Sequence, residues 1–367
     1  MRMKKPPSER ARSANVTIRD VAAELDLSIT TISRALNGYS DVGEATRERV
    51  AEAAARMGYR PNRNAQRLVT RRTRNIGWVQ PDNERKFLDP HFVEVMAGVL
   101  RGARAGHYDI VLTSELAEGE VAAYERYVAE NGVDGFILDL PREDDPRIAF
   151  LLSTGHPFVV HGREARAGRY GWVDVDNYGN FYKLARLMIA NGRRRVAFIN
   201  GDERYTYALH RRMGVVDAIA DAGLPPDTLR LHNGVHPMGE AGYRLTELAL
   251  ADPDIDAILY SSILMAIEGQ AAIRAVRGEN HAIAVGTMDD RLAYVDLTPH
   301  AGRMTRVRSS LREAGRALVE ELVRRCEDHI APRGTLMASE FVLAEGMDGA
   351  SLALPLPVET GARRPPV

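Results

Sequence analysis

The stretch from Thr17 to Leu68 constrains the fold of this chain more than any other. Apolar residues recur there at helical spacing in three short segments, and a basic segment follows Pro61. Ser28 precedes the second segment and can cap it, while Gly58 can end the third. The pattern predicts three helices, the first two of which form a helix-turn-helix with the turn between them.

Charge is distributed unevenly along the chain. The 367 residues carry a net charge of -1, but residues 1–75 contain 16 Lys and Arg against 8 Asp and Glu, so the remainder is acidic. A basic end on an acidic body points to a polyanion partner at that end alone, with a solvated basic arm as the alternative. The second helix carries hydroxyls, an Arg and an Asn, which are groups that read base edges and phosphates in a major groove. A helical bundle whose polar face only meets water is the structural alternative.

From Asn75 the pattern changes to short apolar runs that alternate with amphipathic segments. Such alternation predicts parallel sheets covered on both faces, and about ten strands exceed one comfortable sheet. We therefore expect two similar lobes, with a boundary near Arg163 to Asp176 and crossings back near Ala301 and Ala331. The expected strands include NIGWV, YDIVLT, VDGFIL, PFVVH, WVDV, RVAFIN, DAILY and AIAVG; the expected helices include 91–105, 118–131, 178–191, 206–223 and 240–251.

The remaining composition narrows the class of protein. Cys326 is the single cysteine and no apolar run is long enough to cross a bilayer, so a cytoplasmic location is expected. No metal-ligand spacing, glycine-rich phosphate loop or nucleophile elbow occurs, so we expect no metal, no cofactor and no enzyme activity. The expected organisation is a disordered arm (1–15), a helix-turn-helix domain (16–60), a hinge (61–74), a two-lobed domain (75–353) and a disordered tail (354–367).

The first block resembles the amino-terminal domain of the LacI/GalR family of bacterial transcription regulators. The matching segments are TIRDVA from Thr17, TISRAL from Thr31, Thr46-Arg47, YRPN from Tyr59, and then Ala65 and Leu68. The resemblance implies a small all-α helix-turn-helix domain followed by a two-lobed α/β domain that looks like a periplasmic sugar-binding protein. Parallel sheets in both lobes agree with the alternation described above.

The resemblance assigns DNA contacts position by position. Ile29 and Thr30 stand where the family's base-reading side chains open the recognition helix, and Ile29 could meet a thymine methyl. Gly43 follows Val42 where the family often has Ser, so the cap of the third helix is expected to be weaker. In the family two hinge helices, one per subunit, wedge a leucine into the minor groove; Leu68 holds that position, with an ordinary linker as the alternative. The implied DNA-binding residues are Thr17, Ser28, Ile29, Thr30, Thr31, Ser33, Arg34, Asn37, Arg47, Tyr59, Asn62, Ala65, Gln66 and Leu68.

The resemblance also implies an effector between the two lobes. Arg211 stands where relatives bind ligand hydroxyls or carboxylates, and a surface arginine is the alternative. Phe92 either stacks on a sugar ring or belongs to the core. Asp289 corresponds to the family's cleft aspartate, but the segment is longer than usual, which leaves Asp290 as the alternative. The expected effector residues are Asp89, His91, Phe92, Arg163, Asp176, Arg211 and Asp289.

Together these residues imply a homodimer on a pseudo-palindromic double-stranded DNA operator, most simply repressing genes for carbohydrate uptake or catabolism. The implied effector is a sugar or a sugar phosphate. Ser262-Ile263 and His236-Pro237 depart from the wording of well-known relatives, so the pocket chemistry is expected to differ. An effector-independent regulator of the same fold is the alternative, and the basic amino-terminal block disfavours a pure sugar-binding protein.

Overall fold

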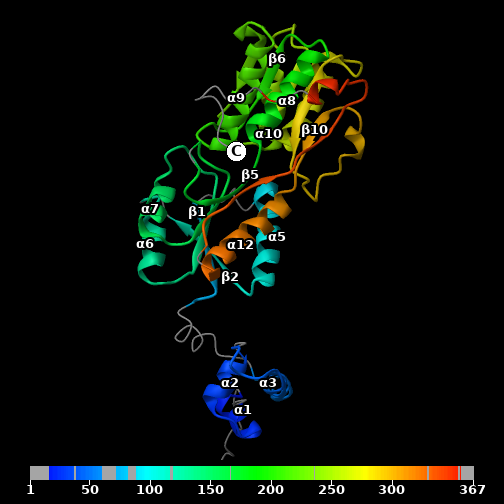
Figure 1. Cartoon of the computed structure of the whole chain (residues 1–367). Coiled ribbons are helices and arrows are strands. Elements are labelled where there is room, and N and C mark those ends of the chain that lie inside the picture. Colours follow the sequence, from blue (N-terminus) through cyan, green and yellow to red (C-terminus); the bar gives the residue numbers. More distant parts are fainter. Residues whose placement is uncertain are drawn as a thin grey trace, which may run out of the picture. The chain divides into compact units, whose positions relative to one another are not determined.

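The computed structural model describes residues 16–36, 39–59, 72–81, 88–115, 119–165, 167–234, 236–328, 330–353 and 356. The chain forms two compact units, which divide between Thr73 and Arg74 (Figure 1). None of the described helices is both long and apolar enough to span a membrane.

The first unit contains the three predicted helices, α1 (Ile18–Leu25), α2 (Ile29–Leu36) and α3 (Glu44–Met57). Val21, Ile32 and Val50, one from each helix, are fully buried and form the centre of its core. Asp26 ends α1 in the left-handed backbone conformation, with φ 52°, and this turns the chain toward α2. The core thereby fixes which face of α2 is turned outward.

The second unit has two lobes, and in each a sheet lies between two layers of helices (Figure 1). The sheet of lobe A has the order β11-β5-β4-β3-β1-β2, and all neighbouring strands are parallel. Helices α5 and α12 cover one face around Trp78 and Val159, while α6 and α7 cover the other around Phe136 and Leu138. Its elements are β1 (Asn75–Pro81), α5 (Pro90–Ala105), β2 (Asp109–Glu115), α6 (Ala122–Ala129), β3 (Gly135–Asp139), α7 (Pro146–Thr154), β4 (Phe158–His161), β5 (Gly171–Val175), α12 (Leu311–Asp328) and β11 (Gly334–Met337).

Lobe B repeats this plan. Its sheet has the order β12-β10-β9-β8-β6-β7, and only β12 runs antiparallel to its neighbour. Helices α8 and α9 cover one face around Phe198 and Met288, and α10 and α11 cover the other around Ile199 and Ile258. Its elements are α8 (Asn177–Ala190), β6 (Val196–Ile199), α9 (Thr206–Asp221), η2 (Pro226–Thr228), β7 (Leu229–His232), α10 (Gly239–Ala249), β8 (Ala257–Tyr260), α11 (Ile263–Arg277), β9 (Ala284–Asp289), η3 (Thr298–His300), β10 (Thr305–Arg308), β12 (Glu340–Val342) and η4 (Ala350–Ala353).

The chain crosses between the lobes three times, after β5, after β10 and after β11. The first crossing, at Asp176, lies at the end of the predicted boundary. The other two, at 309–310 and 338–339, lie further along the chain than Ala301 and Ala331. The strands before them were not among those expected, because β10 alternates arginines with buried residues and β11 is a half-exposed edge strand. The predicted two-lobed architecture with parallel sheets is confirmed.

Candidate functional site

The start of α1 is held by the side chain of Asp20. The Asp20 carboxylate accepts a hydrogen bond from the Thr17 backbone N–H at 2.7 Å and one from the Thr17 hydroxyl at 2.8 Å. These two bonds lower the pKa of Asp20 because they favour its charged form. Thr17, one of the implied DNA-binding residues, is therefore an exposed residue in a fixed position.

Helix α2 begins with the predicted cap at Ser28. Its Oγ accepts a hydrogen bond from the Thr31 backbone N–H at 3.0 Å and lies 2.8 Å from the Thr31 hydroxyl. Ile29 and Thr30 follow on the outward face, and Ile29 is 44% exposed although it is a large apolar side chain. An exposed isoleucine beside hydroxyls, at the first turn of a capped helix, suits contact with thymine methyls and base edges.

Arg34 lies further along α2 and is paired with the loop that follows this helix. Its Nη2 lies 2.5 Å and its Nε 3.2 Å from the two Asp41 carboxylate oxygens, and its guanidinium lies over the Tyr39 ring at 5.1 Å. Arg47 of α3 reaches the same loop, with Nη1 donating to the Tyr39 carbonyl at 3.5 Å. The loop thus orients two of the predicted DNA contacts, a role that the sequence did not show for Tyr39 or Asp41.

Several other predicted positions can be located. Ser33 and Tyr59 are half-buried, and Tyr59 packs against the core of the first unit. Gly43 is the N-cap of α3 and makes no side-chain cap, as its lack of a hydroxyl implies. Asn37, Asn62, Ala65, Gln66 and Leu68 lie outside the described residues.

In the second unit, His91 joins the two lobes. The Asp89 carboxylate caps α5 by accepting from the His91 backbone N–H at 2.9 Å, and it accepts from His91 Nδ1 at 2.8 Å. His91 Nε2 lies 3.4 Å from Ser262 Oγ and 3.5 Å from Asp290 Oδ2, both in lobe B. Burial opposes the charged imidazolium, but the hydrogen bond to Asp89 and the charges of Asp290 and Asp89 outweigh it and raise the pKa of His91.

Arg211 of α9 is the best-placed candidate for ligand recognition. It is only 6% exposed, so it is not the surface arginine that the sequence left open. Its Nε donates to Asn177 Oδ1 at 2.8 Å, its Nη1 donates to the Ser261 carbonyl at 2.5 Å, and the rings of Phe181 and Tyr207 flank it. Among the described residues the Arg211 hydrogen bonds use Nε and Nη1, which leaves the two N–H donors of Nη2 available to a ligand.

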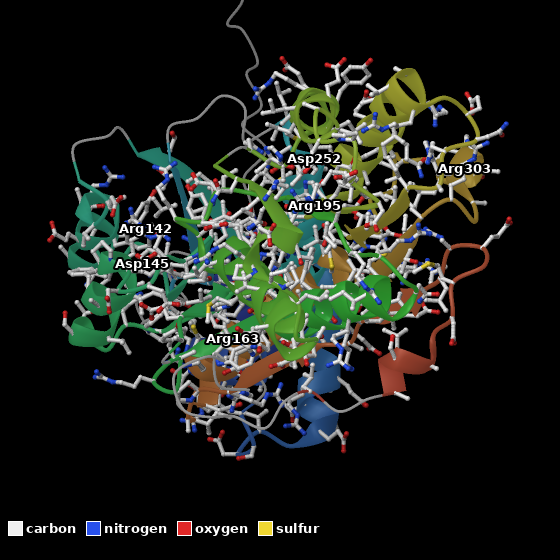
Figure 2. All side chains as sticks on the ribbon, turned by 90° about the horizontal axis from the view of Figure 1, so that it is seen from above. Arg142, Asp145, Arg163, Arg195, Asp252 and Arg303 are labelled. Carbon is white, nitrogen blue, oxygen red and sulfur yellow. The ribbon has the colours of Figure 1, made fainter. Side chains whose placement is uncertain are left out.

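Arg163, which is labelled in Figure 2, is 1% exposed and so is buried within the same unit. Its guanidinium lies over the Trp172 ring at 4.7 Å, and its Nε is 3.6 Å from Asp174 Oδ2. Its Nε and Nη1 have no hydrogen-bond partner in the described part of the chain. Burial raises the pKa of Asp174 to about 6, although the charges of Arg163 and His210 lower it. Unpaired donors on a buried cation are a feature of sites that bind a polar ligand or water.

The raised pKa of Asp174 predicts a measurable pH dependence of stability. The folded state holds this proton more tightly than the unfolded chain does, so the stabilisation is complete below about pH 4 and is lost as the pH rises through about 6. We expect the unfolding free energy of the wild type minus that of Asp174→Asn to fall by about 3 kcal/mol across this interval and then to stay level. Urea unfolding of both proteins at stepped pH measures it. A difference that is flat or rises with pH would contradict the raised pKa.

The two aspartates at the end of β9 have different partners. Asp289 accepts from Arg306 Nη1 at 3.0 Å and lies 3.7 Å from Arg308 Nε, both on β10. Asp290, one residue later, lies beside His91 and interacts electrostatically with Arg211. Burial raises the pKa of Asp290, with these two cations opposing the rise. The structure therefore brings Asp290, not Asp289, to the residues that join the lobes.

Two further predicted effector residues have structural roles. Phe92 is buried against Trp78, with ring centroids 5.1 Å apart, and belongs to the core of lobe A. Asp176 caps α8, where its Oδ1 accepts from the Gly179 backbone N–H at 2.8 Å. Core packing accounts for the position of Phe92, because only 4% of its surface is exposed.

Sequence reasoning missed several members of this interlobe region. Glu94 of α5 is buried, accepts from the Ala293 backbone N–H of lobe B at 3.1 Å, and pairs with Arg312 at 2.8 Å. On the other side His210 of α9 lies 3.6 Å from Glu143 of lobe A. Asp174 and Asn177 flank Asp176 in the segment VDVDN, and that cluster of polar residues after a buried strand could have indicated both. Among the described residues, no group of His, Cys, Asp and Glu could hold a metal ion.

A helix-turn-helix unit joined to a two-lobed domain with polar, partly unpaired groups between its lobes defines a class of transcription regulators. Residues 17–62 match the family described as bacterial regulatory proteins, lacI family. Residues 73–299 match the periplasmic binding proteins and sugar binding domain of the LacI family. The chain belongs to the LacI family of transcriptional regulators.

Individual relatives agree with this assignment. The HTH-type transcriptional regulator AglR of Rhizobium meliloti (strain 1021) is 40% identical over 317 residues, which are 84% of this chain and 87% of AglR. RafR of Escherichia coli is also an HTH-type transcriptional regulator. It is 32% identical over 263 residues, which are 72% of this chain and 77% of RafR. These relatives are regulators, which confirms the expectation that the chain is not an enzyme.

Solved structures share the fold. The transcriptional regulator CelR–cellobiose complex gives a TM-score of 0.64 at 27% identity, covering 90% of this chain and 99% of that one. The Lac repressor dimer bound to operator and the anti-inducer ONPF gives a TM-score of 0.72 at 21% identity. The match covers 89% of this chain and 98% of that one. At 21% identity the likeness concerns the fold alone.

Proposed function

We propose that the chain is a homodimeric repressor that binds a pseudo-palindromic operator and responds to a small carbohydrate held between its lobes. The observation that carries the effector part is Arg211, a buried guanidinium whose Nη2 donors are unused in the described structure. Sugar hydroxyls accept such hydrogen bonds well, and a charged donor makes them stronger. AglR, RafR and the CelR–cellobiose complex are the supporting relatives.

The proposed effector residues are Arg211, Arg163, Asp89, His91 and Asp290. Asp290 is included in preference to Asp289 because it lies beside His91 at the contact between the lobes. Polar groups from both lobes would close on a ligand together, so the lobe angle would depend on occupancy. For Asp176 and Phe92 we propose structural roles.

On the DNA side, Ile29 and Thr30 are proposed to read base edges, with Thr17, Arg34 and Arg47 fixing the register through phosphates. Two copies of α2 in one dimer would require two similar half-sites. Leu68 retains its proposed role as a minor-groove wedge, on the resemblance of its segment to the family. A regulator of this kind acts on DNA in the bacterial cytoplasm.

The proposal is tested by selecting DNA sites from a random pool with the full-length protein. Anisotropy titrations of the selected site are then run with and without cellobiose and a panel of other mono- and disaccharides. We expect two protomers per site, affinity that falls steeply with salt, and at least one sugar that changes the affinity about tenfold or more. If DNA binds but no sugar changes its affinity, the effector-independent alternative replaces the sugar-responsive one.

A further inference from the structure

Lobe B contains a pocket that the proposed effector does not use. Its volume is about 290 Å³, just below the range of about 300–1,000 Å³ that is usual for small-molecule sites. It is lined by the ends of β9 and β10, by Ile263 at the start of α11, and by the loop that follows β9. Asp290 and Ala293 of this loop contact α5 of lobe A, whereas Arg291 and Leu292 face the pocket.

The charge of the pocket wall is positive. Arg291, Arg306 and Arg308 line it against a single carboxylate, that of Asp289. Asp289 pairs closely with Arg306 at 3.0 Å and more loosely with Arg308 at 3.7 Å. Arg308 also lies 3.7 Å from Glu340, but that carboxylate is largely exposed and solvent weakens the pair. One carboxylate at the wall cannot neutralise three guanidinium groups.

Two of these arginines have side-chain N–H groups that make no hydrogen bond among the described residues. Arg308 Nε is buried and makes no hydrogen bond within the described residues. The Arg291 side chain likewise has no hydrogen bond or ion pair there, and its backbone N–H donates to Asp289 Oδ1 at 3.0 Å. Arg291 also adopts the left-handed conformation, with φ 55°, which a non-glycine residue rarely adopts. That conformation is held by Asp289 at the rim of the pocket.

The start of α11 adds to this potential. Ile263 is the first residue of a 15-residue helix, and Ser262 caps it by accepting from the Leu264 backbone N–H. The amino-terminal end of a helix carries a partial positive charge and favours anions. Leu292, Val295 and Leu297 complete the wall with aliphatic surface.

We propose that this pocket binds a small organic anion, a phosphate or a carboxylate, whose oxyanion is held by Arg291 and Arg308. The aliphatic wall would cover the carbon skeleton of the ligand. None of the residues that line the pocket is among the proposed effector residues, so the two proposals can be tested with different variants. The proposal stands whether or not a sugar is the effector.

The test is calorimetry of the full-length protein at low ionic strength, titrated with inorganic phosphate in one arm and with succinate in the other. The variants are Arg308→Gln and Arg291→Gln, and the control is Arg303→Gln, a half-exposed arginine of the same lobe outside the pocket. All variants keep the basic DNA-binding unit, so phosphate bound there cancels in the comparison.

We expect one saturable site for at least one of the two anions, with affinity lowered about tenfold or more by either pocket variant and unchanged by the control. Binding in the phosphate arm alone identifies a phosphate site, and binding in the succinate arm alone identifies a carboxylate site. The proposal is overturned if neither anion saturates, if both pocket variants bind as the wild type does, or if Arg303→Gln lowers affinity equally. Arg291 is exposed, so Arg291→Gln is expected to fold. It therefore tests anion binding even if Arg308→Gln fails to fold.

Discussion

Replacing Arg211 with methionine is expected to lower the affinity for the effector sugar about 100-fold or more. The two Nη2 donors are proposed to bind sugar hydroxyls, and a hydrogen bond to a charged group is worth about 1.5–3 kcal/mol. Losing two of them amounts to about 3 kcal/mol, or two powers of ten in the dissociation constant. Methionine preserves the contact with the Phe181 and Tyr207 rings, so the fold should survive. Calorimetry with the sugar that alters operator binding measures the loss.

Arg212→Met provides the matched control. Arg212 is the next residue of α9, but its side chain is half-exposed and pairs with Glu203 at 2.8 Å. Its replacement should leave sugar affinity within about twofold, because its guanidinium is paired with Glu203 and is not among the proposed effector groups. Both variants should bind operator DNA without sugar as the wild type does. Equal sugar affinity in wild type and Arg211→Met would remove Arg211 from the binding site.

Gly98→Ala is expected to destabilise the effector unit by about 3 kcal/mol, which lowers its melting temperature by roughly 6 °C. A Cβ at Gly98 of α5 would lie 2.0 Å from the Arg312 carbonyl oxygen of α12, and one at Gly315 of α12 would lie 2.2 Å from the Val95 carbonyl oxygen. The obstacles are backbone atoms, so the two helices must move apart. That movement would also disturb the pair between Glu94 and Arg312.

Thermal unfolding monitored by circular dichroism checks this expectation. Gly168→Ala is the control, because a Cβ there meets nothing within 4 Å and its backbone is outside the left-handed region. We expect the control to change stability by less than about 0.5 kcal/mol. A melting temperature for Gly98→Ala equal to that of the control would show that α5 and α12 adjust at no cost.

Local patterns predicted the parts of the structure that depend on local chemistry. Ser28 as a cap, the buried stripe through Ile32 and the αβ alternation after Asn75 follow from helix spacing, hydrogen-bonding capacity and apolar runs. The short strands β7, β11 and β12 carry mostly half-exposed residues, and β10 alternates buried residues with arginines. Such strands form because they can pair with the edge of a neighbouring strand. A local sequence pattern carries no information about that pairing.

Contacts between segments that are distant in the chain also could not be predicted from the sequence. The choice between Asp289 and Asp290 depends on where β9 ends and on which side β10 places Arg306 and Arg308. Phe92 lies one residue from His91, yet it turns into the core while His91 reaches lobe B, because successive residues of α5 point in different directions. Glu94 reads as an ordinary charged helix residue, and only the tertiary structure shows it buried between Arg312 and Ala293.

The three crossings between the lobes bear on how the protein is made. Helix α12 supplies Leu318, Val319 and Leu322 to the core beneath the sheet of lobe A, but these residues come more than a hundred positions after β5. While the chain leaves the ribosome, the part of that face that α5 does not cover stays exposed to water until α12 is made, after nearly all of lobe B has been synthesised. We therefore expect lobe A to complete its core only after the ribosome has made α12.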